Sequence, residues 1–334
     1  MTPELLAPGL WRIPLSMPVG PAFVNVYLLR SCDGWILIDT GMGFPPVYDE
    51  LAAALAHASV EPAQLRQILL THVHPDHSGN APRLTGLSCA PICVHPADVE
   101  LLAWILRPGS AERLGATLLA AGAAPDRVTE VIVSAARLFA LFPPLTAGRL
   151  LHHGDSFSTA LGPLDVIHTP GHSPGHVCFH LPARGLLFAG DTVLPEIFPH
   201  IGFVEDQDCL GDFLLTLDRL QAIPEARILP AHGLPFDGLD AWCQRTRAEA
   251  LRRLERVRSL AAEGLNPAQI VDRIWQRELR GTDYHLALTS VLAQLAHPVP
   301  RSGPVQPSAA AKPVQPAKPA PPATEQTPAD SRLP

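Results

Sequence analysis

The sequence predicts an α/β fold, and three observations predict it. A buried apolar run at residues 67–70 leads directly into residues 71–80, which are rich in side chains that bind metals. Two β-rich runs, residues 23–29 and 35–39, flank a hairpin signal at 31–34. Residues 46–58 have the apolar spacing of a helix. Strands that alternate with helices and end in polar loops are typical of α/β proteins.

The remaining elements follow from the same two patterns. Short apolar runs bounded by turn residues predict strands, and apolar residues three or four positions apart predict helices. The further strands are expected at 91–95, 164–168 and 185–189, and the further helices after residue 81, at several places within 97–145, and at 241–263, 267–277 and 284–297.

These elements divide the chain into three expected parts. Residues 1–240 form the main domain, with 97–145 as a helical insert beside the site, and residues 241–298 form a helical extension. Residues 299–334 are dominated by Pro, Ala, Gln and Ser, so we expect a disordered tail. No apolar run approaches the roughly 18 residues of a membrane span. The N-terminus lacks the pattern of a signal peptide, and the six cysteines lack paired spacing, so we expect a cytoplasmic protein with free thiols.

The charge is uneven along the chain. The net charge of the whole chain is −7, which is the sum of −12 in residues 1–240 and +5 in residues 241–334. Residues 241–298 carry nine arginines against six acidic side chains. Because an anionic body repels polyanions, this distribution favours a small-molecule substrate over a nucleic acid.

A dense group of candidate metal ligands lies in residues 71–80. His72 and His74 are two positions apart, so on an extended segment they face the same side and can share one ion. Asp76 and His77 follow where the chain turns, so they can hold a second ion. A single histidine is more often structural than a ligand, but four such side chains within six residues favour a metal site.

Three further candidates recur downstream, each between a strand and a loop. They are His172 after Pro170-Gly171, Asp191 after Gly190, and His232 after Ala231. The carboxyl ends of strands are where α/β folds gather their functional side chains. The repeated occurrence of candidate ligands after strands therefore argues against a histidine cluster that is merely exposed on the surface or purely structural.

Over about residues 10–235 the chain resembles the metallo-β-lactamase-fold hydrolases, because the H-x-H-x-D-H motif at 72–77, His172, Asp191 and His232 occur in that family's order. The resemblance points to the glyoxalase II-like and β-lactamase-like 2 branch, which includes members with a small helical or winged-helix extension. It implies an αββα sandwich of two mixed sheets with outer helices, and a polar hairpin at 150–159 before the second sheet. It also implies one zinc on His72, His74 and His172, a second on Asp76, His77 and His232, and Asp191 between the two.

The ligand types are consistent with this implied chemistry. Imidazole and carboxylate suit Zn²⁺, with two ions expected per chain, although iron and manganese accept the same donors. Two ions that share a water lower its pKa and supply hydroxide as a nucleophile. We expect Asp76 and Asp191 to be the catalytic carboxylates, with Asp76 passing a proton to the leaving group.

Several other residues are candidates for supporting or substrate-binding roles. Asp39 is expected either to hold a ligand histidine or to form a turn, and His176 is at most a supporting residue. The insert, with Trp104, Phe139 and Phe142, is expected to cap an apolar pocket, to offer a homodimer face, or to pack its own core. The candidate substrate contacts are Trp104, Leu194, Glu196 and His200.

The leading hypothesis is a dinuclear zinc hydrolase of a small ester-like substrate, with a thioester or lactone preferred. A tyrosine at position 194 would favour an acyl-homoserine lactonase, and Leu194 stands there. One alternative is a phosphodiesterase or endoribonuclease that holds its substrate through residues 241–298. The other is a non-catalytic or iron-binding member of the fold.

Overall fold

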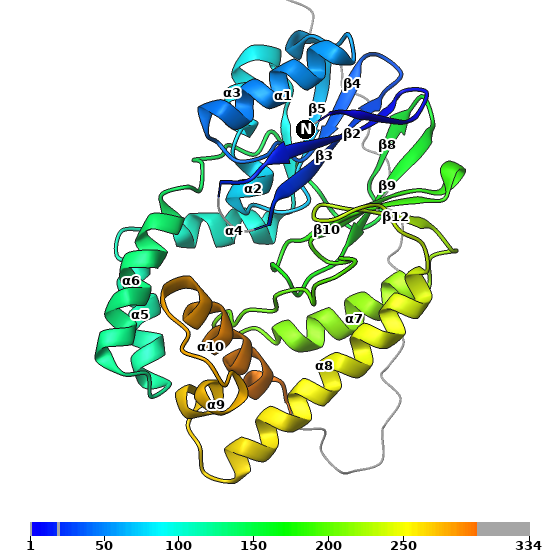
Figure 1. Ribbon diagram of the computed structural model, residues 1–334. Helices are drawn as coiled ribbons and strands as arrows, with labels where there is room; N and C mark the ends of the chain where they lie inside the picture. Colours follow the sequence, from blue (N-terminus) through cyan, green and yellow to red (C-terminus); the bar gives the residue numbers. More distant parts are fainter. Residues whose placement is uncertain (1, 19–20, 299–334) are drawn as a thin grey trace, which may run out of the picture. The chain divides into compact units, whose positions relative to one another are not determined.

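Two mixed β-sheets form the centre of the protein (Figure 1). The computed structural model describes residues 2–18 and 21–298, so the tail expected at 299–334 lies outside the described residues. The first sheet has seven strands in chain order, of which β1 to β4 are antiparallel and β4 to β7 are parallel. Their bounds are β1 (Glu4–Ala7), β2 (Leu10–Ser16), β3 (Phe23–Arg30), β4 (Trp35–Ile38), β5 (Leu65–Leu69), β6 (Ile92–Val94) and β7 (Arg149–Leu150).

The second sheet has five strands in the order β12-β11-β10-β9-β8, and only β11 and β12 pair in parallel. Their bounds are β8 (Ser156–Thr159), β9 (Gly162–His168), β10 (Val177–Leu181), β11 (Leu186–Gly190) and β12 (Arg227–Pro230). The two sheets pack face to face through a buried apolar cluster that includes Leu29, Ile38, Phe179 and Phe188. Removal of this apolar surface from water holds the sheets together.

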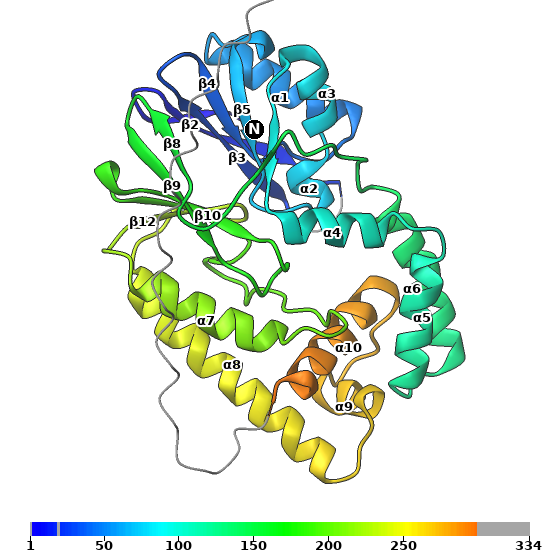
Figure 2. The ribbon, with the colours of Figure 1, turned by 180° about the vertical axis from the view of Figure 1, so that it is seen from behind.

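Helices cover the outer face of each sheet (Figures 1 and 2). The first sheet packs against α1 (Pro45–His57), α3 (Ala81–Ser88) and α4 (Pro96–Ile105). The second sheet packs against α7 (Cys209–Gln221) and the first half of α8 (Leu239–Ala262). The expected αββα sandwich is therefore confirmed. No helix in the described part of the chain combines the length and apolar character needed to cross a membrane.

The helical insert and the C-terminal helices share one core. The insert forms α4, α5 (Ser110–Ala120) and α6 (Pro125–Phe139), and the extension continues from α8 into α9 (Pro267–Ile274) and α10 (Gly281–Ala296). Leu118 and Val131 of the insert lie in the same buried cluster as Leu260, Ile270 and Leu288 of the extension. The insert therefore does not pack a core of its own. The described residues 241–298 contain helices and no strand, so the extension has no wing.

The prediction of a hairpin at 150–159 is wrong. β7 pairs with β6 in the first sheet, whereas β8 pairs with β9 in the second. The segment therefore crosses from one sheet to the other, and the hairpin is the β8–β9 pair that follows it. The family resemblance implied a hairpin here, but the local sequence does not show which strands pair on either side of the turn.

Candidate metal centre

The seven candidate ligands follow the carboxyl ends of strands that point to one edge of the sandwich. β4 and β5 are parallel, and the loop after β5 leads through the short helix α2 (Pro75–Ser78). Because β10 is antiparallel to both β9 and β11, and β12 is parallel to β11, strands β9, β11 and β12 also run in one direction. Residues far apart in the sequence are thereby brought together.

Three histidines form the first donor set. His74 Nδ1 lies 2.8 Å from His72 Nε2 and 3.0 Å from His172 Nε2. These three nitrogen atoms can reach a single ion. The two-residue spacing of His72 and His74 thus places both rings on one side, as expected.

Asp76, His77 and His232 form the second donor set. Asp76 Oδ2 lies 3.4 Å from His77 Nε2 and 3.3 Å from His232 Nε2. These three side chains also form a group that can hold an ion. His77 is fully buried and His232 is 7% exposed, whereas the Asp76 side chain is 16% exposed, so most of the set is shielded from solvent.

Asp191 lies between the two donor sets. Its Oδ1 atom is 3.5 Å from His77 Nε2 and 3.4 Å from His232 Nε2, whereas its Oδ2 atom is 3.6 Å from His172 Nε2. Each carboxylate oxygen therefore faces a different set. This is the arrangement that a bridging ligand requires.

Backbone carbonyls fix the ring orientation of two ligand histidines. The Nδ1 atom of His172 lies 3.0 Å from the His200 carbonyl oxygen, and the Nδ1 atom of His232 lies 3.0 Å from the Phe23 carbonyl oxygen. Because a carbonyl only accepts, each Nδ1 donates its proton, and Nε2 is the ring nitrogen that faces the centre. The Nε2 atom of each ring is therefore positioned to coordinate a cation.

Asp39 supports His77 in the same way. Asp39 Oδ2 lies 2.9 Å from His77 Nδ1, and the Thr71 hydroxyl and backbone N–H each donate to the Asp39 carboxylate at 2.8 Å. Asp39 has a φ of 59°, a conformation that Asp tolerates better than most residues. Of the two roles expected for Asp39, the structure places it in contact with a ligand histidine.

The residues present fit a pair of divalent cations. His77 Nε2 and Asp191 Oδ1 are buried and have no hydrogen-bond partner among the described residues. Burial lowers the pKa of His74 to about 3, so that ring is neutral and can donate its lone pair. Burial alone would lower the pKa of His232, but the Asp191 and Asp76 carboxylates outweigh it and raise the pKa to about 10. The centre thus attracts positive charge, and nitrogen with oxygen donors suits zinc, iron or manganese.

His176 supports the loop that carries Asp191. Its Nε2 atom accepts from the Asp191 backbone N–H at 3.1 Å, and its Nδ1 atom lies 2.8 Å from the Thr169 hydroxyl and 3.0 Å from the Thr192 hydroxyl. Gly190 has a φ of 49°, and a Cβ there would come within 2.5 Å of His176 Nε2. Only glycine therefore allows this close approach.

Sequence reasoning missed Asp98, which joins the two loops that carry the first donor set. This fully buried carboxylate accepts from the Val73 N–H at 2.9 Å, the Ser173 hydroxyl at 3.0 Å and the Gly175 N–H at 2.6 Å. Burial raises its pKa to about 6, against the opposing effect of these hydrogen bonds. The one local signal was an acidic residue in the first turn of a helix that begins with Pro96. That signal more often marks a favourable helix N-terminus.

We expect Asp98→Ala to lower the free energy of unfolding by about 3 kcal/mol, because it leaves two buried backbone N–H groups and a hydroxyl without an acceptor. Metal affinity should fall about ten- to a hundred-fold, the usual cost of losing a supporting contact. Urea denaturation and metal titration measure the two effects. Asp126→Ala is the matched control, since Asp126 is exposed in the first turn of another helix that begins with proline.

The pH dependence of stability gives a second readout for Asp98. Between about pH 4 and pH 6 the native protein keeps a proton on Asp98 that the unfolded chain has released. Stability from this group therefore falls as the pH rises through that window. Equal slopes for the wild type and Asp98→Ala would contradict the assignment.

A cavity of about 490 Å³, here called the metal cavity, opens from the candidate ligands. Trp104, Leu194 and His200 line it, as expected for substrate contacts, and so do Phe139 and Phe142 of the insert. Glu196 does not line it. Glu196 is exposed and lines a neighbouring hollow, which shares the lining residues Pro21, Ile197 and His232 with the metal cavity.

Comparisons with known proteins agree with this arrangement. The chain is 30% identical to acyl-coenzyme A thioesterase MBLAC2 from Gallus gallus over 218 residues, which are 62% of this chain and 72% of that protein. It is 26% identical to atrochrysone carboxyl ACP thioesterase AgnL7 from Paecilomyces divaricatus over 290 residues, which are 84% of this chain and 76% of that protein. Several other matched relatives are longer, and the chain spans about half of their length.

A solved structure and a family model identify the family. The crystal structure of a metallo-beta-lactamase family protein from Thermus thermophilus has a TM-score of 0.74 and 28% identity, and the match covers 87% of this chain and 93% of that chain. The model of the metallo-beta-lactamase superfamily matches residues 19–232, which include all seven candidate ligands. The chain therefore belongs to the metallo-beta-lactamase superfamily.

Proposed function

We propose that this hydrolase cleaves a thioester with an apolar acyl group, using two divalent metal ions held by the two donor sets, with zinc as the expected metal. One observation carries the proposal. The two donor sets and Asp191 face a cavity of about 490 Å³ whose remaining wall is mostly apolar, with side chains that include Trp104, Phe142 and Phe203. Such a wall suits an uncharged acyl group.

The chain's own residues would orient the reaction. When bound, two divalent ions supply a hydroxide nucleophile at neutral pH and a Lewis acid for the carbonyl oxygen. His172, His232 and His77 are held by their outer ring nitrogens, so their inner nitrogens need no rearrangement. Asp76 is the proposed proton carrier, which takes a proton from the attacking water and passes it to the sulfur as the carbon–sulfur bond breaks.

The charge of the metal cavity favours a thioester over a phosphodiester. The residues that line the cavity include no lysine or arginine. Burial lowers the pKa of His200 to about 3 and of His285 to about 4, so both rings are neutral near pH 7. A phosphodiester backbone would therefore find no cation on this wall apart from the metal ions. Relatives named thioesterases, among them MBLAC2 and AgnL7, support the same choice.

A substrate panel tests the proposal. Protein loaded with Zn²⁺, Fe²⁺ or Mn²⁺ is assayed on an octanoyl thioester of N-acetylcysteamine, an octanoyl lactone, bis(p-nitrophenyl) phosphate and a β-lactam. We expect the thioester to have the highest kcat/KM. Faster hydrolysis of the phosphodiester would favour the phosphodiesterase alternative instead.

Two histidine variants test whether the measured hydrolysis comes from this protein or from a contaminating esterase. His232→Ala removes a member of the second donor set and should abolish the activity. His152→Ala changes an exposed histidine outside the centre and should leave it intact. Thioester hydrolysis that survives His232→Ala, or no turnover with any of the three metals, would refute the proposal.

A further inference from the structure

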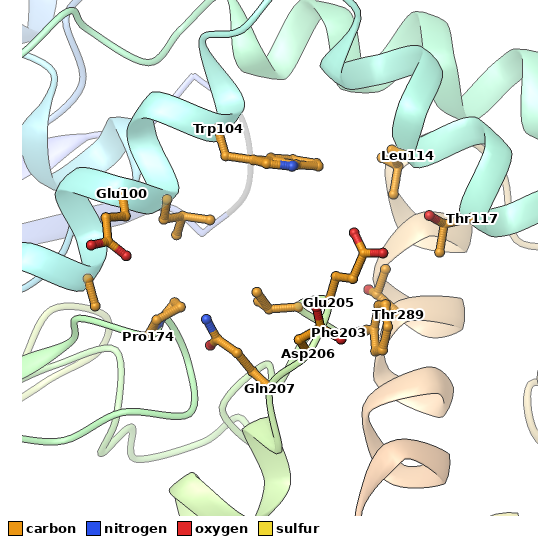
Figure 3. Close-up of a pocket in the computed structure, with 13 residues that line it drawn as sticks. Glu100, Trp104, Leu114, Thr117, Pro174, Phe203, Glu205, Asp206, Gln207 and Thr289 are labelled. Carbon is orange, nitrogen blue, oxygen red and sulfur yellow. The ribbon is translucent and has the colours of Figure 1, made fainter.

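A second cavity continues outward from the metal cavity. This outer subsite has a volume of about 360 Å³ and lies between α4, α5, the loop 203–207 and α10 (Figure 3). More than half of its lining residues also line the metal cavity, namely Leu101, Trp104, Leu114, Pro174, Phe203, Val204 and Thr289. The two cavities are therefore parts of one elongated space.

The outer subsite has an apolar wall and an acidic rim. Leu101, Trp104 and Leu114 form one side, and Phe203 and Val204 form part of the other. Figure 3 shows Trp104 and Leu114 on the insert helices, across the space from Glu205 and Thr289. The charged residues of the lining are Glu100, Glu205 and Asp206, all exposed, and the lining includes no lysine or arginine.

We propose that the outer subsite binds the distal part of an extended, uncharged acyl chain whose thioester carbonyl lies in the metal cavity. Trp104, which lines both cavities, positions the chain where they meet. The inference rests on the proposed thioester hydrolysis and adds the orientation and the length of the substrate.

Charge decides which end of the thioester enters the outer subsite. Pantetheine carriers bear phosphate groups, and three carboxylates at the rim would repel them. The carrier therefore leaves the metal cavity by another side. The same rim disfavours an acyl chain that ends in a carboxylate.

A chain-length series with one leaving group tests the inference. Butanoyl, octanoyl and dodecanoyl thioesters of N-acetylcysteamine are compared by kcat/KM. We expect a gain of about four-fold for each methylene that the space buries. Thr117→Phe narrows the outer subsite, because Thr117 lines only this cavity, and should lower the dodecanoyl-to-butanoyl ratio by about ten-fold or more.

The neighbouring Ala116→Phe is the matched control. Ala116 is exposed on the same helix and lines neither cavity, so the variant should keep the wild-type ratio. A ratio that falls equally in both variants would show that the effect comes from the helix and not from the subsite.

A terminal carboxylate gives a readout that depends on charge. The thioester of suberic acid has the length of the octanoyl compound and should react about ten-fold or more slowly, since like charges would meet at the rim. The triple change Glu100→Gln, Glu205→Gln and Asp206→Asn should reduce the difference in kcat/KM between the octanoyl and the suberic thioester. If the difference in kcat/KM stays unchanged, the acidic rim does not repel the terminal carboxylate.

The outcomes separate this inference from the proposed function. No hydrolysis of any thioester would refute the proposed function itself. Hydrolysis of the butanoyl compound, with no gain from longer chains and no change in ratio for Thr117→Phe, would refute only the outer subsite.

Discussion

Asp191→Ala is expected to lower kcat/KM by more than about a hundred-fold at saturating zinc. Loss of a residue that merely supports a metal ligand costs about ten- to a hundred-fold, and Asp191 faces both donor sets directly. Its two oxygens lie 3.4 Å from His232 Nε2 and 3.6 Å from His172 Nε2. Thioester kinetics and metal analysis by mass spectrometry measure the loss, and we expect fewer than two bound metal ions per chain.

Asp237→Ala is the control for that variant. Asp237 is exposed, and its one ion pair within the described residues is with Arg227, at 3.2 Å, so its loss should change neither turnover nor metal content. Turnover close to wild type in Asp191→Ala would show that Asp191 is not a bridging ligand.

Removal of metal is expected to abolish turnover and to lower the melting temperature by about 10 °C. Without a cation, the buried atoms His77 Nε2 and Asp191 Oδ1 have no hydrogen-bond partner among the described residues. Chelation followed by differential scanning calorimetry and activity assays measures both effects. Zn²⁺ should restore activity and melting temperature together.

Calcium provides the control for metal identity. Ca²⁺ prefers oxygen ligands in larger numbers, whereas five of the seven candidate ligands are histidines, so it should not restore activity. Parallel additions of Fe²⁺ and Mn²⁺ show which metal gives the highest rate. Full activity in chelated protein whose metal content has been shown to be negligible would contradict a metal-dependent mechanism.

Local sequence determined the strands β3 to β6, β9 and β11 and the candidate ligands, whereas β1, β2, β10, β12 and α7 were not predicted. The strands that deliver His172 and Asp191 are short apolar runs followed by glycine-containing turns, and this pattern lies within about ten residues. The pairing of His72 with His74 follows from the two-residue period of an extended chain. Apolar runs, turns and the spacing of ligands depend only on residues close together in the chain, so they can be predicted from the amino-acid sequence alone.

Tertiary structure alone decided how the supporting parts come together. The role of Asp98 depends on Ser173 and Gly175, which are more than seventy residues away. The common core of Leu118 and Ile270 likewise joins segments that the sequence treats as separate. The crossing of residues 150–159 between the sheets depends on which strands they meet. Contacts of this kind come from burial between distant segments, and the periodicity of either segment carries no information about its partner.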